Sequence, residues 1–267
     1  MPRTPCFQTA ACLAASVALT VLAGSAHAAL VGLWQFENDF TDSSSQGNNG
    51  AGINGVNFAA SQAGFGQAGD FSGADTHVLV PHDPSLDITS TITIAAWVLP
   101  DGNAWEGILA KSPSNGSNNN HAGNYELRLE NGSQNMTFLY QRGGSNDTQP
   151  VDSGVTVASN PTWTHIAVTM DGSTLRFYTN GTLANTVAAP ATGFGATNTN
   201  PLYLGSRADL FTDFDGLLDD VAIFNEVLND SQIATISTGD FTAFGVPEPS
   251  SAALLGLSGL ALLRRRR

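Results

Sequence analysis

Short apolar and β-branched runs alternate with clusters of Gly, Asn, Ser and Asp along most of this chain of 267 residues. The clearest series begins with Thr164–Met170, turns at Asp171-Gly172, continues over 175–178 and turns again at Asn180-Gly181. Asp-Gly and Asn-Gly between such runs are the strongest short signals of a β-hairpin. Further strand-like runs cover 30–36, 91–98, 125–129, 136–140, 202–204 and 217–224. With one short candidate helix at 231–236, capped by Asn229, the pattern predicts an all-β sandwich or barrel.

The N-terminal segment has the features of a secretory signal peptide. Arg3 precedes an apolar run over 10–23, and Ala26-His27-Ala28 supplies a small-x-small cleavage site before Ala29. The apolar run is shorter than the ~20 residues that a membrane anchor needs. We therefore expect residues 1–28 to be removed by signal peptidase during export.

Charge and cysteine content exclude several classes of function. The formal net charge is −13, and the body at 29–245 holds 22 of the 23 acidic residues but only five basic ones. Such a body repels a phosphate backbone and an anionic membrane surface, so nucleic-acid binding is not expected. Cys6 and Cys12, the two cysteines, both lie in the signal segment. The mature protein is therefore predicted to lack disulfides, thiol nucleophiles and cysteine-bound zinc.

The C-terminal segment combines Pro247-Glu248-Pro249, an apolar run over 252–263 and four closing arginines, 264–267. It resembles the PEP-CTERM sorting signal of Gram-negative bacteria. The resemblance implies recognition by an exosortase, transient membrane contact of the apolar helix, and delivery to the outer surface or extracellular matrix. We assign 241–267 to this linker and sorting signal.

Four blocks of the body occur in a characteristic order. They are Leu33-Trp34-Gln35-Phe36-Glu37 with Asp42-Ser43-Ser44; Phe71-Ser72-Gly73 with Thr93-Ile94-Ala95-Ala96-Trp97-Val98; Trp163-Thr164-His165-Ile166 with Phe177-Tyr178-Thr179-Asn180-Gly181; and Leu202-Tyr203-Leu204-Gly205 with Gly216-Leu217-Leu218-Asp219-Asp220-Val221-Ala222-Ile223-Phe224. Together they resemble a LamG-like (concanavalin A-like) domain over 29–240. The resemblance implies a jelly-roll sandwich of two antiparallel sheets, a fold shared by lectins, glycosidases and adhesion modules. Function must therefore be argued from a site.

The resemblance also implies a structural calcium ion that ties the first strand to the last. Calcium takes six to eight hard oxygen ligands, which an acidic extracellular domain supplies readily. On that basis we expect Glu37, Asp42 and Asp219 to bind Ca²⁺. Asp209, Asp213 and Asp215 form a second acidic cluster on the loop before the last strand, and solvated turn aspartates are the alternative interpretation.

A sugar-binding surface needs an exposed aromatic ring flanked by polar groups. Trp34, Trp97 and Trp163 lie within apolar runs and are expected in the core. The best exposed candidate is Trp105, in a Gly- and Asn-containing loop, followed by Tyr140 and Arg142 at the end of a predicted strand.

Three functions stay open at this point. The first is a non-catalytic module that binds glycan or exopolysaccharide, and the second is a structural or adhesion protein with protein partners. The third is a glycoside hydrolase, because Glu37 and Asp39 alternate as the paired carboxylates of a retaining enzyme do. The sequence favours the first, since no His-Glu-x-x-His, Gly-x-Ser-x-Gly or phosphate-loop motif is present.

Overall fold

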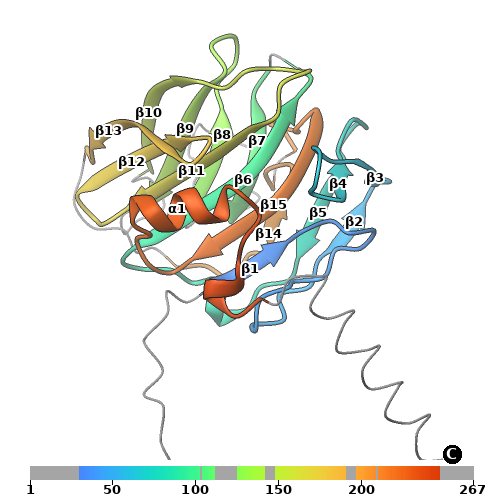
Figure 1. The fold of residues 1–267 in the computed structure, drawn as a ribbon, viewed down its shortest axis with the longest axis horizontal. Coiled ribbons are helices and arrows are strands. Elements are labelled where there is room, and N and C mark those ends of the chain that lie inside the picture. The colour runs from blue at the N-terminus through green and yellow to red at the C-terminus, as the bar shows by residue number, and fades with distance from the viewer. Residues whose placement is uncertain are drawn as a thin grey trace, which may run out of the picture.

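A computed structural model describes residues 30–102, 104–111, 125–141, 148–190, 197–208 and 210–246. Two antiparallel sheets face each other, as predicted (Figure 1). Sheet A runs in the order β13 (Thr182–Ala188), β12 (Thr174–Thr179), β11 (Thr164–Met170), β6 (Ile92–Pro100), β15 (Gly216–Phe224), β4 (Gln67–Asp70) and β3 (Asn57–Ala60), with β1 (Leu30–Trp34) also paired to β15. Sheet B runs in the order β10 (Thr148–Thr156), β9 (Asn135–Gln141), β8 (Tyr125–Leu129), β7 (Glu106–Lys111), β14 (Leu202–Leu204), β5 (His77–Val80) and β2 (Ala51–Ile53).

Alternation along the strands builds the core between the sheets. On β11, Ile166 and Val168 point into this core, while Ala167 faces outward into a second apolar cluster. On β8, Tyr125, Leu127 and Leu129 point inward. Successive side chains point to opposite faces of a strand, so the residues between these three lie on the outer face of sheet B.

The outer face of sheet A is covered by the C-terminal part of the domain. The helix α1 (Asp230–Ile236) lies across this sheet, followed by the 3₁₀ turn η2 (Thr242–Phe244) (Figure 1). Ile233 and Ile236 of the helix are buried against this face. Asn229 caps the helix in a reciprocal capping box with Gln232, which confirms the predicted cap.

The predicted hairpin corners are present. Asp171-Gly172, with Ser173, connects β11 to β12, and Asn180-Gly181 connects β12 to β13. Asn180 and Gly181 both have positive φ, 49° and 74°, as a two-residue type I′ turn requires.

The predicted core tryptophans divide into three cases. Trp34 is fully buried between the sheets. Trp97 is buried on the outer face of sheet A, where its ring contacts His165 and Phe65. Trp163 is only half-buried.

Both predicted targeting segments, 1–28 and the Pro247-Glu248-Pro249 signal, fall outside the described residues. Among the residues that are described, no helix is both long and apolar enough to cross a membrane.

Candidate functional site

The predicted glycan-binding residues have different positions in the structure. Trp105 lies half-buried immediately before β7, on the side of sheet B that faces away from the core. Tyr140 is fully buried and stacks on Phe138 inside the core, so the prediction that its ring serves as an exposed platform is wrong. Arg142 lies outside the described residues.

A row of paired side chains starts at Trp105 and follows β8. The Arg128 guanidinium lies over the Trp105 ring, 4.5 Å from its centroid. Its Nη1 is 3.2 Å from Glu126 Oε1, and its Nη2 is 3.0 Å from Glu130 Oε1. The Glu126 side chain is fully buried, so the arginine stabilises a carboxylate that water does not reach.

The row continues onto the loop between β14 and β15. Arg207 Nη1 lies 3.8 Å from Glu126 Oε1, and the Arg207 guanidinium lies 5.5 Å from the centroid of the Phe211 ring. Phe211 is 67% exposed, the highest value among the large apolar side chains of the described chain. We call Trp105, Arg128, Glu126, Arg207 and Phe211 the Trp105–Phe211 row.

Close backbone contacts hold the loop that carries Phe211 against β7. Gly107 N donates to the Thr212 carbonyl at 2.9 Å, and a Cβ at Gly107 would lie only 2.4 Å from that oxygen. A glycine is therefore required where the loop crosses the strand. Leu210, next to Phe211, has a φ of 54°, an unusual conformation for a leucine.

Glu106 anchors the other end of this loop. Its Oε2 accepts a hydrogen bond from Asp215 N at 2.7 Å, and the residue is 1% exposed. Burial, together with the nearby negative charges of Asp215 and Asp101, raises the pKa of Glu106 to about 7. The carboxyl group next to Trp105 therefore changes charge near neutral pH.

Two of the three predicted calcium ligands lie within electrostatic range of each other. Glu37 lies in the exposed bend after β1, and its charge acts on both Asp219 and Asp220 of β15. Burial raises the pKa of both aspartates, and Glu37 raises it further. Ser61 Oγ donates to Asp219 Oδ2, and Gln35 Nε2 donates to Asp220 Oδ1. Asp220 was not among the predicted ligands. It has a positive φ and lies at an irregularity in the β15 register.

Asp42 does not join this group, which corrects the predicted ligand set. Its Oδ1 accepts from Leu33 N and Ser44 N, and its Oδ2 accepts from Ser44 Oγ and Asn48 N, all within 2.9 Å. Trp34 pairs with Asp42 on one side of β1 and with Val221 on the other, so the strand separates Asp42 from β15. The carboxylate therefore organises the following turn, where N–H and O–H donors occupy both of its oxygens.

The remaining acidic candidates also differ from the predictions. Asp213 accepts from Ser206 Oγ and Asp75 N, while Asp215 faces Asp101 and Asp70, and Asp209 lies outside the described residues. Within the described ranges, no three Asp, Glu, His or Cys side chains are placed to hold a metal ion together.

The hydrolase hypothesis rested on an alternating carboxylate pair. Glu37 and Asp39 instead lie exposed in a bend after β1 has ended, with positive φ at Phe36 and Asn38. They are therefore not neighbours on one face of a strand, which is the arrangement that the retaining mechanism needs.

Four members of the row were not predicted from the sequence. The alternation along β8 places Glu126 and Arg128 on one face, and this pattern can be read from the sequence. Arg207 and Phe211 gave no such signal, because they reach the row only through the packing of their loop on β7.

Comparison with known proteins identifies the family. Residues 72–234, more than half of the chain, match the family model described as the concanavalin A-like lectin/glucanases superfamily. The chain belongs to this superfamily. Residues 245–267 match the PEP-CTERM protein-sorting motif, which indicates export and sorting to the cell envelope or surface. Both resemblances seen in the sequence are thereby confirmed.

Individual relatives of this superfamily member are distant. It is 26% identical over 163 residues, 60% of its length, to adhesion G-protein coupled receptor V1 of Danio rerio, of which it spans 2%. Domain 4 of AbnA, an extracellular GH43 arabinanase of Geobacillus stearothermophilus solved with arabinotriose, has a TM-score of 0.60 at 18% identity, covering 79% of this chain and 99% of that one. The ligand-binding domain of botulinum neurotoxin serotype D, solved with N-acetylneuraminic acid, has a TM-score of 0.58 at 13% identity, covering 80% of this chain and 51% of that one. At these identities the likeness shows the shared fold.

Proposed function

We propose that this exported protein is a non-catalytic glycan-binding module of the bacterial cell surface or extracellular matrix. The glycan would lie along the Trp105–Phe211 row on the outer face of sheet B. The observation that carries the proposal is the 67% exposed Phe211 ring beside a buried Arg–Glu–Arg arrangement that ends at a half-buried tryptophan.

The chemistry of the row suits a carbohydrate. A sugar ring has an apolar C–H face that packs on an aromatic ring, and hydroxyl groups that bind charged side chains at its rim. Phe211 and Trp105 supply rings at the two ends. Between them the side chains of Glu130 and Arg128 are 20% and 11% exposed and can meet hydroxyl groups, whereas Glu126 and Arg207 are buried and hold the row in place. Because Arg128 and Arg207 are held by Glu126, little conformational freedom would be lost on binding.

Similar structures and the sorting motif support the same proposal. Two domains of this fold were solved with a sugar bound, arabinotriose in one and N-acetylneuraminic acid in the other. We propose that signal peptidase and an exosortase process the chain, and that its C-terminal apolar run contacts the membrane only transiently. An exopolysaccharide outside the cell is then the natural ligand class.

Calcium stays part of the proposal with a revised ligand set. Because no three carboxylates of the described residues converge on one point, the proposed Ca²⁺ would take two from among Glu37, Asp219 and Asp220 and water as its further ligands; Asp42 is excluded because its oxygens are already used. The ion would neutralise the two buried aspartates and tie the bend after β1 to β15.

The decisive experiment is binding of the purified protein to a panel of neutral and acidic polysaccharides by affinity electrophoresis and calorimetry. Phe211→Ala and Trp105→Ala should each weaken binding about fivefold or more, since a central aromatic contact contributes more than ~1 kcal/mol. Leu183→Ala is the matched control, because Leu183 is 40% exposed on the distant edge strand β13. No binding across the panel, or equal loss in the Leu183 variant, would contradict the proposal.

A further inference from the structure

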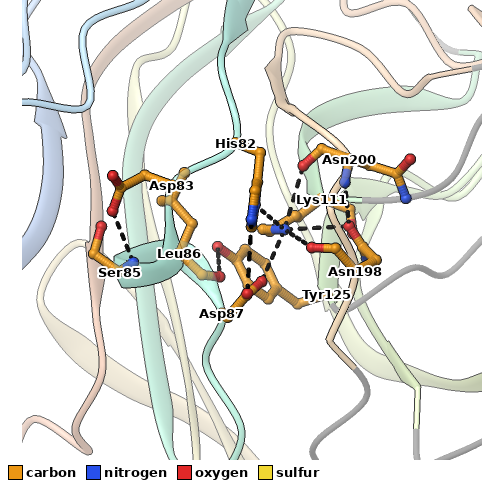
Figure 2. Close-up of polar contacts among 9 residues, drawn as sticks. All are labelled: His82, Asp83, Ser85, Leu86, Asp87, Lys111, Tyr125, Asn198 and Asn200. Carbon is orange, nitrogen blue, oxygen red and sulfur yellow. Dashed lines mark hydrogen bonds and ion pairs between the residues drawn. The ribbon is translucent and has the colours of Figure 1, made fainter.

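The only lysine of the chain, Lys111, is completely buried at the end of β7 (Figure 2). Its Nζ lies 3.1 Å from Asp87 Oδ1, 2.8 Å from the Asn198 carbonyl oxygen and 3.2 Å from Asn198 Oδ1. Nζ also lies 3.3 Å from the Asn200 carbonyl oxygen and 3.4 Å from His82 Nδ1. A lysine is among the residue types least often buried, so this environment requires an explanation.

The groups around Nζ can take a proton from it. Burial lowers the pKa of Lys111, although the Asp87 carboxylate partly opposes that effect. His82 Nε2 lies 3.9 Å from Asp87 Oδ2, so imidazole and carboxylate are both close to the amine and to each other. Tyr125 completes the surroundings; it is fully buried, and its hydroxyl donates to the Leu86 carbonyl oxygen. The site therefore combines a desolvated amine with two adjacent proton acceptors.

The Asn198 side chain is fixed beside the amine. Its Nδ2 donates to the Lys111 carbonyl oxygen at 3.3 Å, and its Oδ1 accepts from Asn200 N at 2.9 Å as well as from Nζ. The amide carbon lies one C=O bond, about 1.2 Å, from the Oδ1 atom that Nζ contacts. The Asn200 N–H points at the oxygen on which negative charge would develop if that carbon were attacked.

We propose that Lys111 and Asn198 join in an intramolecular isopeptide bond. Asp87 or His82 removes a proton from Nζ, and the neutral amine attacks Cγ of Asn198 to form the Nζ–Cγ bond. Nζ then gives up a second proton, which Nδ2 takes up as the Cγ–Nδ2 bond breaks, and ammonia leaves while the first proton stays on its acceptor. One amide replaces another, so the step needs no oxidant, reductant or further reactant.

The cross-link would serve an exported protein that has no cysteines after signal removal. It joins residues 87 positions apart and ties the end of β7 to the segment that leads into β14. A covalent bond there constrains the unfolded chain as a disulfide does. This inference is independent of the glycan-binding proposal.

A single lysine makes the test simple. The folded full-length protein is purified, denatured and treated with an endoproteinase that cleaves only after unmodified lysine. Wild type is expected to stay uncut, and tandem mass spectrometry of a tryptic digest should recover the Lys111 peptide joined to the peptide containing Asn198, lighter than their sum by one ammonia. Asn198→Ala should be cut once, into two fragments.

Thr199→Ala is the matched control, because Thr199 is exposed and adjoins Asn198 in the chain while its side chain takes no part in the step. It should stay uncut like wild type. Complete cleavage of wild type at Lys111, with both peptides at their full sequence mass, would overturn the proposal even if the Asn198 variant does not fold. Loss of one water, with Lys111 joined to Asp87, would overturn the assignment to Asn198.

Discussion

Glu106 provides a quantitative test of how the loop beside the row is held. The residue is buried, its carboxyl group accepts from Asp215 N, and burial raises its pKa from 4.5 to about 7. Glu106→Gln keeps the shape of the side chain and an acceptor oxygen but removes the titration. The variant therefore separates the ionisation of the group from its packing.

The sign of the effect follows from proton binding. Because the pKa of Glu106 is higher in the folded protein, the folded protein binds this proton more tightly than the unfolded chain does. The stabilisation that the protonated carboxyl group gives is complete below about pH 4.5 and is lost as the pH rises through about 7. Each unit of pKa difference corresponds to about 1.36 kcal/mol. Raising the pH from about 5.5 to 8.5 should therefore lower the free energy of unfolding of wild type by about 2 kcal/mol through Glu106. The Glu106→Gln variant should not show this loss.

The assay is urea unfolding of both proteins at these two pH values, followed by tryptophan fluorescence. Other acids titrate in both proteins and affect both equally. The contribution of Glu106 is therefore the amount by which the loss of unfolding free energy between the two pH values is larger in wild type than in the variant. The exposed Glu226→Gln serves as the control variant and should leave the pH dependence as it is in wild type. A Glu106→Gln protein whose stability falls with pH as steeply as wild type would refute the reasoning.

Three further predictions concern the fold and its proposed ion. Gly107→Ala should cost about 1–3 kcal/mol in urea unfolding, because its Cβ would meet the Thr212 carbonyl oxygen at 2.4 Å; an unchanged midpoint would contradict the close approach. Asn229→Ala should cost about 1 kcal/mol through loss of the α1 cap, and no measurable loss would show that the capping box is not stabilising. Calcium should raise the melting temperature of wild type but not of an Asp219→Asn, Asp220→Asn double variant; equal melting in calcium and chelator would remove the ion from the account.

Much of sheet A was predictable because its signals are local. The Asn180-Gly181 turn fixes a hairpin through two adjacent residues with positive φ, and the Asn229 cap marks the start of α1 within one residue. The short or exposed strands gave no such signal. In β13 almost every side chain is exposed, and β10 contains Pro150, so neither shows an apolar alternation.

The candidate site was only partly predictable for a related reason. Trp105 was found from its loop composition, whereas Tyr140 was misplaced, although it alternates in step with Met136 and Phe138, which point into the core. Phe211 reaches the row through the sheet order β8–β7–β14, which joins segments far apart in the sequence. Contacts of that kind depend on tertiary packing, and local patterns do not encode them.

We propose above that a glycan binds on the outer face of sheet B, between Trp105 and Phe211. The most direct measurement is an NMR titration of the four tryptophan indole N–H signals with the tightest-binding oligosaccharide of the panel. We expect the Trp105 signal to shift with ligand concentration while the signals of buried Trp34 and Trp97 stay in place. A saturable shift of the Trp163 signal with Trp105 unchanged would place the ligand elsewhere and contradict the claim.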